Sequence, residues 1–233
     1  MQELPFTLTE DQESQPAVGL VVLQSDETME HELRHWLPDH YRLFHTRIPN
    51  HQEVNHNSLL DMQKRLPGSV SLLPSNTHYK VIAYGCTSAT TVIGEEVVRE
   101  AINSVFPKSL VTNPITAIKA KLAHLNAKRI ALLTPYTPEV SQSMVNLLAN
   151  SGYEISHSGT FNESLDENVA RISSQSILDA IQQLAKHNDI DALVASCTSL
   201  RAFDIIEDAS QNIGCPVMSS NSALAWHIEA LVG

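Results

Sequence analysis

The sequence repeats one strand–helix pattern in its two halves, and this repeat limits the possible folds more than any other feature. In each half, short runs of Val, Ile, Leu and Ala alternate with amphipathic segments, which predicts β-strands alternating with α-helices. Strands are expected over residues 17–23, 41–47, 80–84 and 109–112, and again over 129–133, 153–157, 192–195 and 216–218. Helices are expected over residues 27–37, 58–66 (ended by Pro67-Gly68), 91–104, 116–125, 138–150, 173–187, 201–210 and 223–231.

The alternation predicts an α/β fold of two pseudo-symmetric lobes. Each lobe is expected to be a parallel four-stranded flavodoxin-like sheet with helices on both faces, and the active site is expected between the lobes. Aromatic residues make up only 5% of the chain, so the core must be aliphatic, as is typical of buried parallel strands. We expect a flexible N-terminal arm over residues 1–16, a first lobe over 17–115 and 221–233 with a C-terminal helix, and a second lobe over 116–220.

Composition excludes several classes of partner. The formal net charge of −11 repels phosphate backbones and acidic membranes, so neither nucleic acid nor a membrane is expected as a partner. The first residues contain acids and no apolar run, unlike a signal peptide, and no stretch approaches the roughly 20 apolar residues of a membrane span. Three cysteines without an export signal predict free thiols in the reducing cytoplasm.

One short motif suggests a zinc peptidase. His31, Glu32 and His35 form the H-E-x-x-H pattern that holds zinc in such enzymes. A zinc site also needs a third ligand, and Pro38 ends this segment before a further histidine can follow; Glu53 is the one distant carboxylate considered. We therefore expect two solvated or partly packed histidines and no metal.

Two C-T-S triplets, at residues 86–88 and 197–199, occupy equivalent places in the two halves. Cys86 and Cys197 lie 111 positions apart, and each follows a predicted strand and precedes a predicted helix. The carboxyl ends of parallel strands are where reactive groups gather in such folds. The N–H groups and dipole of a helix N-terminus lower the pKa of a thiol, and the hydroxyl and backbone donors of both triplets, Ser199 included, suit a carboxylate.

Two chemistries fit a pair of thiols that face one cleft. In the first, one thiolate removes an α-proton while the other thiol protonates the opposite face of the carbon. In the second, a thiolate adds to a carbon–carbon double bond, the bond rotates, and the thiolate leaves. The alternative, that both cysteines are merely small buried hydrophobic residues, is weakened by their matched positions. Cys215, which precedes Pro216 at the start of a strand, is expected to be structural.

Several segments together resemble the aspartate/glutamate racemase superfamily, in the branch of maleate isomerase and arylmalonate decarboxylase. Within that branch the likeness is greatest to the ectoine-utilisation protein A family. The matching segments are residues 25–28 (SDET), 30–32 (EHE), 83–88 (AYGCTS), 133–136 (LTPY), 169–172 (VARI), 196–198 (SCT), 200–201 (LR), 219–221 (SSN) and 223–227 (ALAWH).

The resemblance implies cofactor-free chemistry at a paired-cysteine site, and a homodimer. Cys86 and Cys197 match the two catalytic positions, and Tyr136 matches a tyrosine that binds a substrate carboxylate. Thr87, Ser88 and Thr198 match oxyanion-loop positions, and Asn162 lies near an asparagine of the isomerases. Because the decarboxylases keep only the second cysteine, the presence of both favours racemase or isomerase activity.

The loop after the first strand departs from the maleate isomerases. Their neutral loop is replaced here by Ser25-Asp26-Glu27-Thr28, and two acids would repel a dianion such as maleate. If Asp26 faces the cleft, it favours a substrate with an ammonium group, such as a diaminobutyrate derivative from ectoine breakdown. Alternatively, Asp26 or Ser25 simply caps the next helix.

We therefore expect a cytoplasmic, cofactor-independent and metal-free racemase or epimerase that acts at the α-carbon of a small amino or carboxylic acid through Cys86 and Cys197. Thr87, Ser88, Tyr136, Thr198, Ser199, Asp26 and Asn162 are the expected substrate-binding residues. Two alternatives stay open: a maleate-type cis–trans isomerase with a covalent cysteine adduct, and a non-catalytic metabolite-binding protein.

Overall fold

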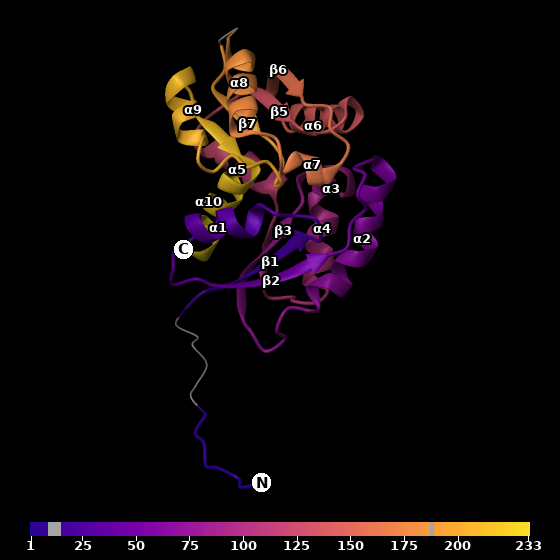
Figure 1. Ribbon diagram of the computed structural model, residues 1–233, viewed down its shortest axis with the longest axis vertical. Coiled ribbons are helices and arrows are strands. Elements are labelled where there is room, and N and C mark those ends of the chain that lie inside the picture. The colour runs from indigo at the N-terminus through magenta and orange to yellow at the C-terminus, as the bar shows by residue number, and fades with distance from the viewer. Residues whose placement is uncertain (9–14, 187–188) are drawn as a thin grey trace.

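The computed structural model describes residues 1–8, 15–186 and 189–233 and contains two four-stranded parallel sheets (Figure 1). The first sheet has the order β2-β1-β3-β4 and the second β6-β5-β7-β8, so the same topology occurs twice. The strands of the first sheet are β1 (Ala17–Leu23), β2 (Arg42–Ile48), β3 (Tyr79–Gly85) and β4 (Leu110–Thr112). Those of the second are β5 (Arg129–Thr134), β6 (Glu154–Thr160), β7 (Ala192–Ala195) and β8 (Val217–Ser219). The predicted fold class is confirmed.

Helices cover both faces of each sheet, and they follow from the amphipathic segments of the sequence. They are α1 (Met29–Trp36), α2 (His56–Val70), α3 (Thr87–Ile93), α4 (Glu95–Asn103), α5 (Pro114–His124), α6 (Pro138–Asn150), α7 (Asp166–Val169), α8 (Ser174–Ala185), α9 (Ile206–Ile213) and α10 (Ser220–Val232). Within the described ranges, no helix has the length and apolar character needed to cross a bilayer.

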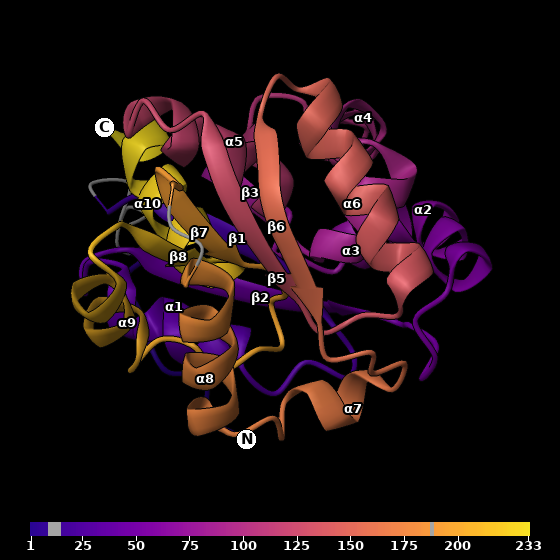
Figure 2. The same ribbon diagram turned by 90° about the horizontal axis from the view of Figure 1, so that it is seen from above.

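The core has two parts because successive side chains of each strand point to opposite faces of its sheet. In β1, Val18, Leu20 and Val22 belong to one buried cluster, whereas Val21 and Leu23 belong to the other. The second sheet divides in the same way, and Figure 2 shows α6 and α8 on its two sides. Strands that are apolar on both faces are therefore required, which explains the continuous aliphatic runs.

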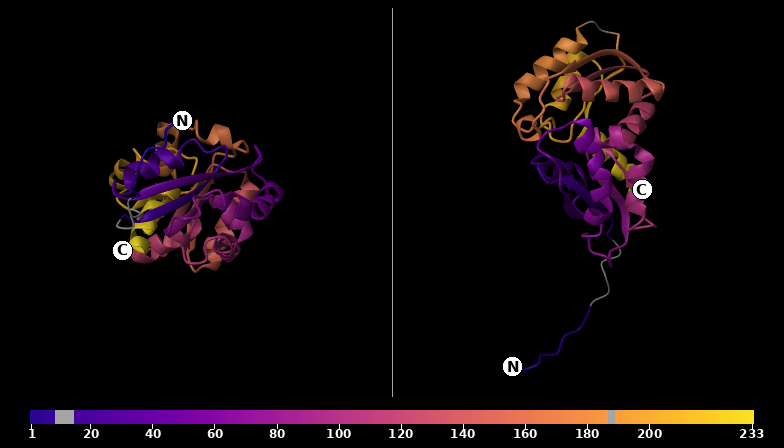
Figure 3. Two further views of the ribbon diagram at one scale, coloured as in Figure 1. Left: turned by 90° about the horizontal axis from the view of Figure 1, so that it is seen from below. Right: turned by 90° about the vertical axis from the view of Figure 1, so that its right-hand side faces the viewer.

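The two lobes are stacked and joined through their helices, as the right-hand view of Figure 3 shows. Helices α5 and α10 contribute to one buried cluster that contains strands of both sheets. Glu32 of α1 accepts hydrogen bonds from the backbone N–H groups of Ala202 (3.1 Å) and Phe203 (3.0 Å) and from the Asn221 side chain (2.7 Å). This buried carboxylate thus connects the first lobe to the second. The domain limits given above remain a prediction.

The N-terminal segment projects away from the first lobe in Figure 1. Residues 1–8 form no helix or strand and are exposed. The arm predicted over residues 1–16 also includes residues 9–14, which lie outside the described residues. Residues 187 and 188 lie outside them as well, and residue 187 is the predicted end of a helix.

Three predicted helix limits are wrong by four or five residues. Helix α2 continues through Pro67-Gly68 to Val70, because Leu66 and Val70 are buried on its inner face and this packing outweighs the lost N–H of proline. The helix expected over 91–104 begins at Thr87 and is divided by Gly94, whose φ of 95° suits glycine and ends α3 as α4 starts. The helix expected from residue 201 begins only at Ile206.

Candidate active site

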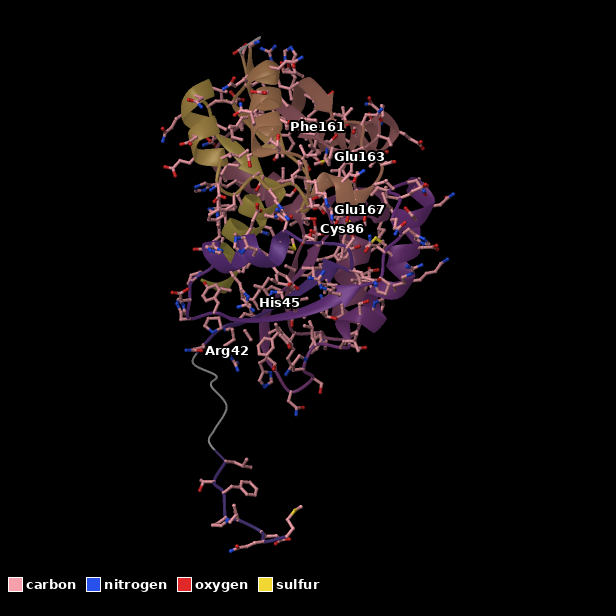
Figure 4. The ribbon with its side chains drawn as sticks, viewed as in Figure 1. Arg42, His45, Cys86, Phe161, Glu163 and Glu167 are labelled. Atoms are coloured by element: carbon pink, nitrogen blue, oxygen red, sulfur yellow. The ribbon has the colours of Figure 1, made fainter. Side chains whose placement is uncertain are left out.

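A small, partly enclosed cavity between the lobes is lined by both matched cysteines. Its volume is about 20 Å³, room for roughly one or two water molecules. The lining residues are Leu23, Asn50, His51, Glu53, Val54, Ser58, Leu59, Met62, Cys86, Ser88, Tyr136, Asp166, Cys197 and Thr198. Figure 4 shows Cys86 at the junction of the lobes, below Glu167 of the second lobe. The topology predicted this meeting, since β3 and β7 both end at the junction.

Cys86 lies at the carboxyl end of β3 and is the N-cap residue of α3. Its sulfur accepts a hydrogen bond from the backbone N–H of Ala89 (3.4 Å) and lies 3.6 Å from the Ser88 hydroxyl. The side chain is only 3% exposed. Cysteine thus takes the capping position that serine or threonine fills in most helices, which fixes the direction of the thiol.

Cys197 occupies the equivalent place after β7, but no helix begins there. The segment 196–205 turns without regular structure, so the thiol receives one backbone N–H, from Ser199 at 3.4 Å. Tyr136 lies after the end of β5, and its hydroxyl also hydrogen-bonds this sulfur, which lowers the pKa of the thiol. Cys197, like Cys86, is 3% exposed.

The expectation of lowered thiol pKa values is wrong. Burial raises the pKa of Cys86 from 9.0 to about 11, although the Ala89 N–H and Ser88 lower it. Burial, followed by the nearby Asp166 carboxylate, raises the pKa of Cys197 from 9.0 to about 12. Loss of hydration and a neighbouring negative charge both disfavour the thiolate, and together they outweigh the few N–H donors. Both groups are therefore thiols at neutral pH in the cavity.

Only some of the predicted binding residues reach the cavity. Ser88, Tyr136 and Thr198 line it together with both thiols. Thr87 instead shares a hydrogen bond of 2.9 Å with Ser220 of α10, away from the lining residues. The backbone N–H of Asn162, an exposed residue with a φ of 54°, donates to the Thr160 hydroxyl, and Asn162 is not a lining residue.

Asp26 holds the start of α1 and does not line the cavity. Its Oδ1 accepts the backbone N–H groups of Thr28 (2.9 Å) and Met29 (2.8 Å), which is the capping arrangement given above as the alternative. Its Oδ2 is buried without a hydrogen-bond partner. Burial raises the pKa of Asp26 from 3.8 to about 6. The carboxylate is thus costly where it lies, close enough to raise the pKa of Cys86 slightly.

The structure adds Asp166, which sequence patterns did not identify. This residue begins α7, is 3% exposed and lines the cavity with the two thiols. Its carboxylate accepts hydrogen bonds from the hydroxyls of Ser25 in the first lobe and Ser199 in the second (3.1 Å for Ser199). A helix of four residues is too short to show a hydrophobic period in the sequence. The one available signal for Asp166 was its position, three residues before the matching segment 169–172.

Residues 50–54 cover the cavity by crossing to the other lobe. The backbone N–H of Val54 donates to Ser164 (3.0 Å), the N–H of Asp166 donates to Gln52 (3.3 Å), and Glu53 and Leu165 form an antiparallel bridge. These contacts place residues of the first lobe beside the start of α7, where both line the cavity.

The histidines of the H-E-x-x-H pattern do not form a metal centre. His31 and His35 are exposed on α1, with ring centroids 4.4 Å apart, and His35 packs at 5.8 Å against Phe203. Across the described ranges, no group of three or more His, Cys, Asp or Glu residues is arranged to hold a metal ion. Glu32 of the pattern serves the lobe junction instead. Cys215 is half-buried two residues before β8.

Comparisons with known proteins agree with this geometry. A family model of arylmalonate decarboxylase matches residues 95–233. A maleate isomerase of Nocardia farcinica is 29% identical over an alignment of 223 residues, and the match covers 91% of this chain and 88% of that protein. The solved structure of the N. farcinica maleate cis–trans isomerase bound to Tris has a TM-score of 0.85 and 27% identity, and the match covers 93% of this chain and 92% of that one.

A second structure of the N. farcinica enzyme is a cysteine-to-serine mutant with a covalently bound succinylcysteine intermediate. Its TM-score is 0.83 at 26% identity, over 93% of this chain and 92% of that one. The family model alone spans more than half of the sequence, and the relatives extend the match over almost all of it. The chain belongs to the arylmalonate decarboxylase family, in its maleate isomerase-like branch.

Proposed function

We propose that the protein is a cofactor-independent racemase or epimerase that moves the α-proton of a small carboxylic or amino acid between Cys86 and Cys197. The observation that carries this proposal is that both thiols, one from each lobe, line the same cavity at the lobe junction. Each thiol comes from a different lobe, so a substrate held between the lobes has one sulfur on each face.

The proton transfers balance once one of the two thiols has lost its proton to solvent. The thiolate of one cysteine takes the α-proton, so that an S–H bond forms as the C–H bond breaks and the electron pair moves into the carboxylate. The opposite thiol then gives its proton to the other face of the carbon and becomes the thiolate. Ser88 and Thr198 line the cavity beside the thiols and are the donors we assign to the developing charge.

The raised pKa values suit this role in two ways. A thiolate whose conjugate acid has a high pKa is a stronger base toward a weakly acidic C–H bond. The two values, about 11 for Cys86 and about 12 for Cys197, are also similar, so the two groups can exchange roles with little energetic bias. A racemase needs this equivalence because it works on both enantiomers.

A second candidate is cis–trans isomerisation through a cysteine adduct, and one relative favours it. The N. farcinica enzyme, a maleate isomerase, carries a succinylcysteine intermediate in its mutant form. In this chain a thiolate would add to a double bond, the resulting single bond would rotate, and the thiolate would leave. The buried Asp166 argues against maleate as the substrate of such an isomerase, because the two carboxylates of maleate would lie beside a third negative charge.

Solvent exchange separates the candidates. Small amino and 2-hydroxy acids are incubated with the protein in deuterated water, and α-deuteration is followed by NMR, with the Cys86→Ser and Cys197→Ser variants alongside. The proposal expects α-deuteration and loss of optical activity by wild type and a loss of at least 100-fold in either variant. Turnover of maleate with a mass adduct on one cysteine and no exchange would favour the second candidate, and equal exchange by both variants would refute the assignment.

The resemblance to ectoine-utilisation proteins supports a place in ectoine breakdown, in the cytoplasm, with a diaminobutyrate derivative as the substrate. The segments that match that family surround the cavity: residues 83–88 and 196–198 carry the thiols, and 133–136 carries Tyr136. Including 2,4-diaminobutyrate and its N-acetyl forms among the acids tested above decides this part of the proposal.

A further inference from the structure

Asp166 is a buried carboxylate without a cation. Its side chain is 3% exposed and its two oxygens accept hydrogen bonds from the Ser25 and Ser199 hydroxyls. Among the residues that the structure describes, no Lys, Arg or His forms an ion pair with it. Arg171, on the segment after α7, and Arg201 pair instead with the exposed Glu27. A carboxylate removed from water needs a counter-charge or a full set of donors, and two hydroxyls supply neither.

The surroundings of Asp166 increase this need. Buried Asp26 interacts with it unfavourably as a second carboxylate, and the two thiols of the cavity are acids as well. Of the residues that line the cavity with Asp166, His51 alone can carry a positive charge, and its ring contacts Asp61 and Arg65 instead. Ser25 belongs to the first lobe and Ser199 to the second, so the carboxylate is held at the junction, where it lines the cavity.

We propose that Asp166 binds the ammonium group of the substrate, so that the site selects an α-amino acid over a dicarboxylate or a hydroxy acid. This inference rests on the proposed proton transfer between Cys86 and Cys197. An ammonium group offers three N–H donors and one positive charge, which are what the carboxylate lacks. The substrate carboxylate then lies toward Ser88 and Thr198, with the α-carbon between the two sulfurs.

The same contact links substrate binding to thiol ionisation. The charge of Asp166 disfavours the thiolate of Cys197 and, more weakly, that of Cys86. An ammonium group beside Asp166 cancels this charge and makes the thiolate easier to form, whereas a dianionic ligand would disfavour it further. The free enzyme therefore keeps unreactive thiols, and the matching substrate activates them.

The test compares Asp166→Asn with Glu167→Gln, a matched control that removes an exposed carboxylate one residue away. Michaelis constants and turnover are measured with alanine and with 2,4-diaminobutyrate, and dissociation constants are measured for succinate as a probe dicarboxylate. We expect Asp166→Asn to raise KM for the amino acids at least tenfold and to tighten succinate binding at least tenfold, with Glu167→Gln unchanged. Unchanged KM and succinate affinity in Asp166→Asn would overturn the assignment.

A second measurement uses the wild-type protein alone and therefore does not depend on folding of the variant. Alanine is compared with lactate, and 2,4-diaminobutyrate with 4-amino-2-hydroxybutyrate, pairs that differ only in the ammonium group at the α-carbon. Exchange of the amino acids at least 100-fold faster than of the hydroxy acids supports the ammonium site. Equal rates overturn it while leaving the two-thiol mechanism intact, and α-exchange with neither class overturns the proposed function itself.

Discussion

The thiol pKa values lead to a quantitative prediction about alkylation. At pH 8, a pKa of about 11 leaves about 10⁻³ of Cys86 as thiolate, and a pKa of about 12 leaves about 10⁻⁴ of Cys197. An unperturbed thiol with a pKa of roughly 8.5 is about one quarter ionised at the same pH. Relative to this unperturbed value, the pKa of Cys197 corresponds to about 5 kcal/mol against the charged form.

Iodoacetamide reacts with the thiolate, so the rate follows this fraction. We expect alkylation of Cys86 to be roughly 200-fold slower than in the unfolded protein, and that of Cys197 roughly 2,000-fold slower, before any further protection by the cavity. Mass spectrometry of the two cysteine-containing peptides, sampled over time at pH 7.5, 8.5 and 9.5, gives both rates in one experiment. Protein unfolded in guanidinium chloride is the reference.

The pH dependence tests the reasoning independently of access to the cavity. Both rates should rise close to tenfold per pH unit up to pH 9.5, because both pKa values lie well above that range. A rate that levels off below pH 8 would show a thiolate stabilised near neutrality. In that case the helix N-terminus at Cys86 would dominate over burial, and the account of the free enzyme would be refuted.

Three further predictions concern stability. Asp26 has a pKa of about 6, above its ordinary 3.8, so its ionisation lowers the free energy of unfolding as pH rises from 4 to 6. The Asp26→Asn variant should avoid up to roughly 3 kcal/mol of this decrease. Urea unfolding of the variant at pH 4 and 7 measures this, and the same pH dependence as wild type would contradict the prediction. Glu32→Ala leaves three donors unpaired at the lobe junction and should cost about 3–5 kcal/mol in urea unfolding; a loss below about 1 kcal/mol would argue against this clamp. Gly85→Ala places a Cβ 2.3 Å from the Met29 sulfur and should lower stability by about 1–3 kcal/mol, whereas an unchanged melting temperature would show that Met29 moves freely.

Elements with strong local signals could be predicted from the sequence alone. The limits of β7 were predicted correctly because four consecutive apolar residues follow the charged Asp191. Helix α6 was predicted at Pro138–Asn150 because proline suits the first helical turn and Gly152 follows the end. The lobe repeat also fixed which strand ends meet, and hence that both C-T-S triplets lie at the junction.

Features that depend on contacts between the lobes could not be predicted. The pKa of each thiol is set mainly by burial, which the local sequence does not show, so the helix-terminus argument gave the wrong sign. Asp166 lies in a four-residue helix with no period, and its role depends on Ser25, which is 141 positions away. Helix α9 starts late because segment 196–205 before it is irregular. The N–H groups of Ala202 and Phe203 in this segment bind Glu32 across the junction.

The most direct test of two-sided proton transfer is the isotope pattern of early turnover in deuterated water. One pure enantiomer of a turned-over acid is sampled at low conversion, and the deuterium content of each enantiomer is measured by chiral chromatography with mass spectrometry. Two thiols on opposite faces predict a product enantiomer that is almost fully deuterated, while the remaining substrate keeps its proton. Protium retained in the product, or equal deuterium in both enantiomers from the start, would contradict the account.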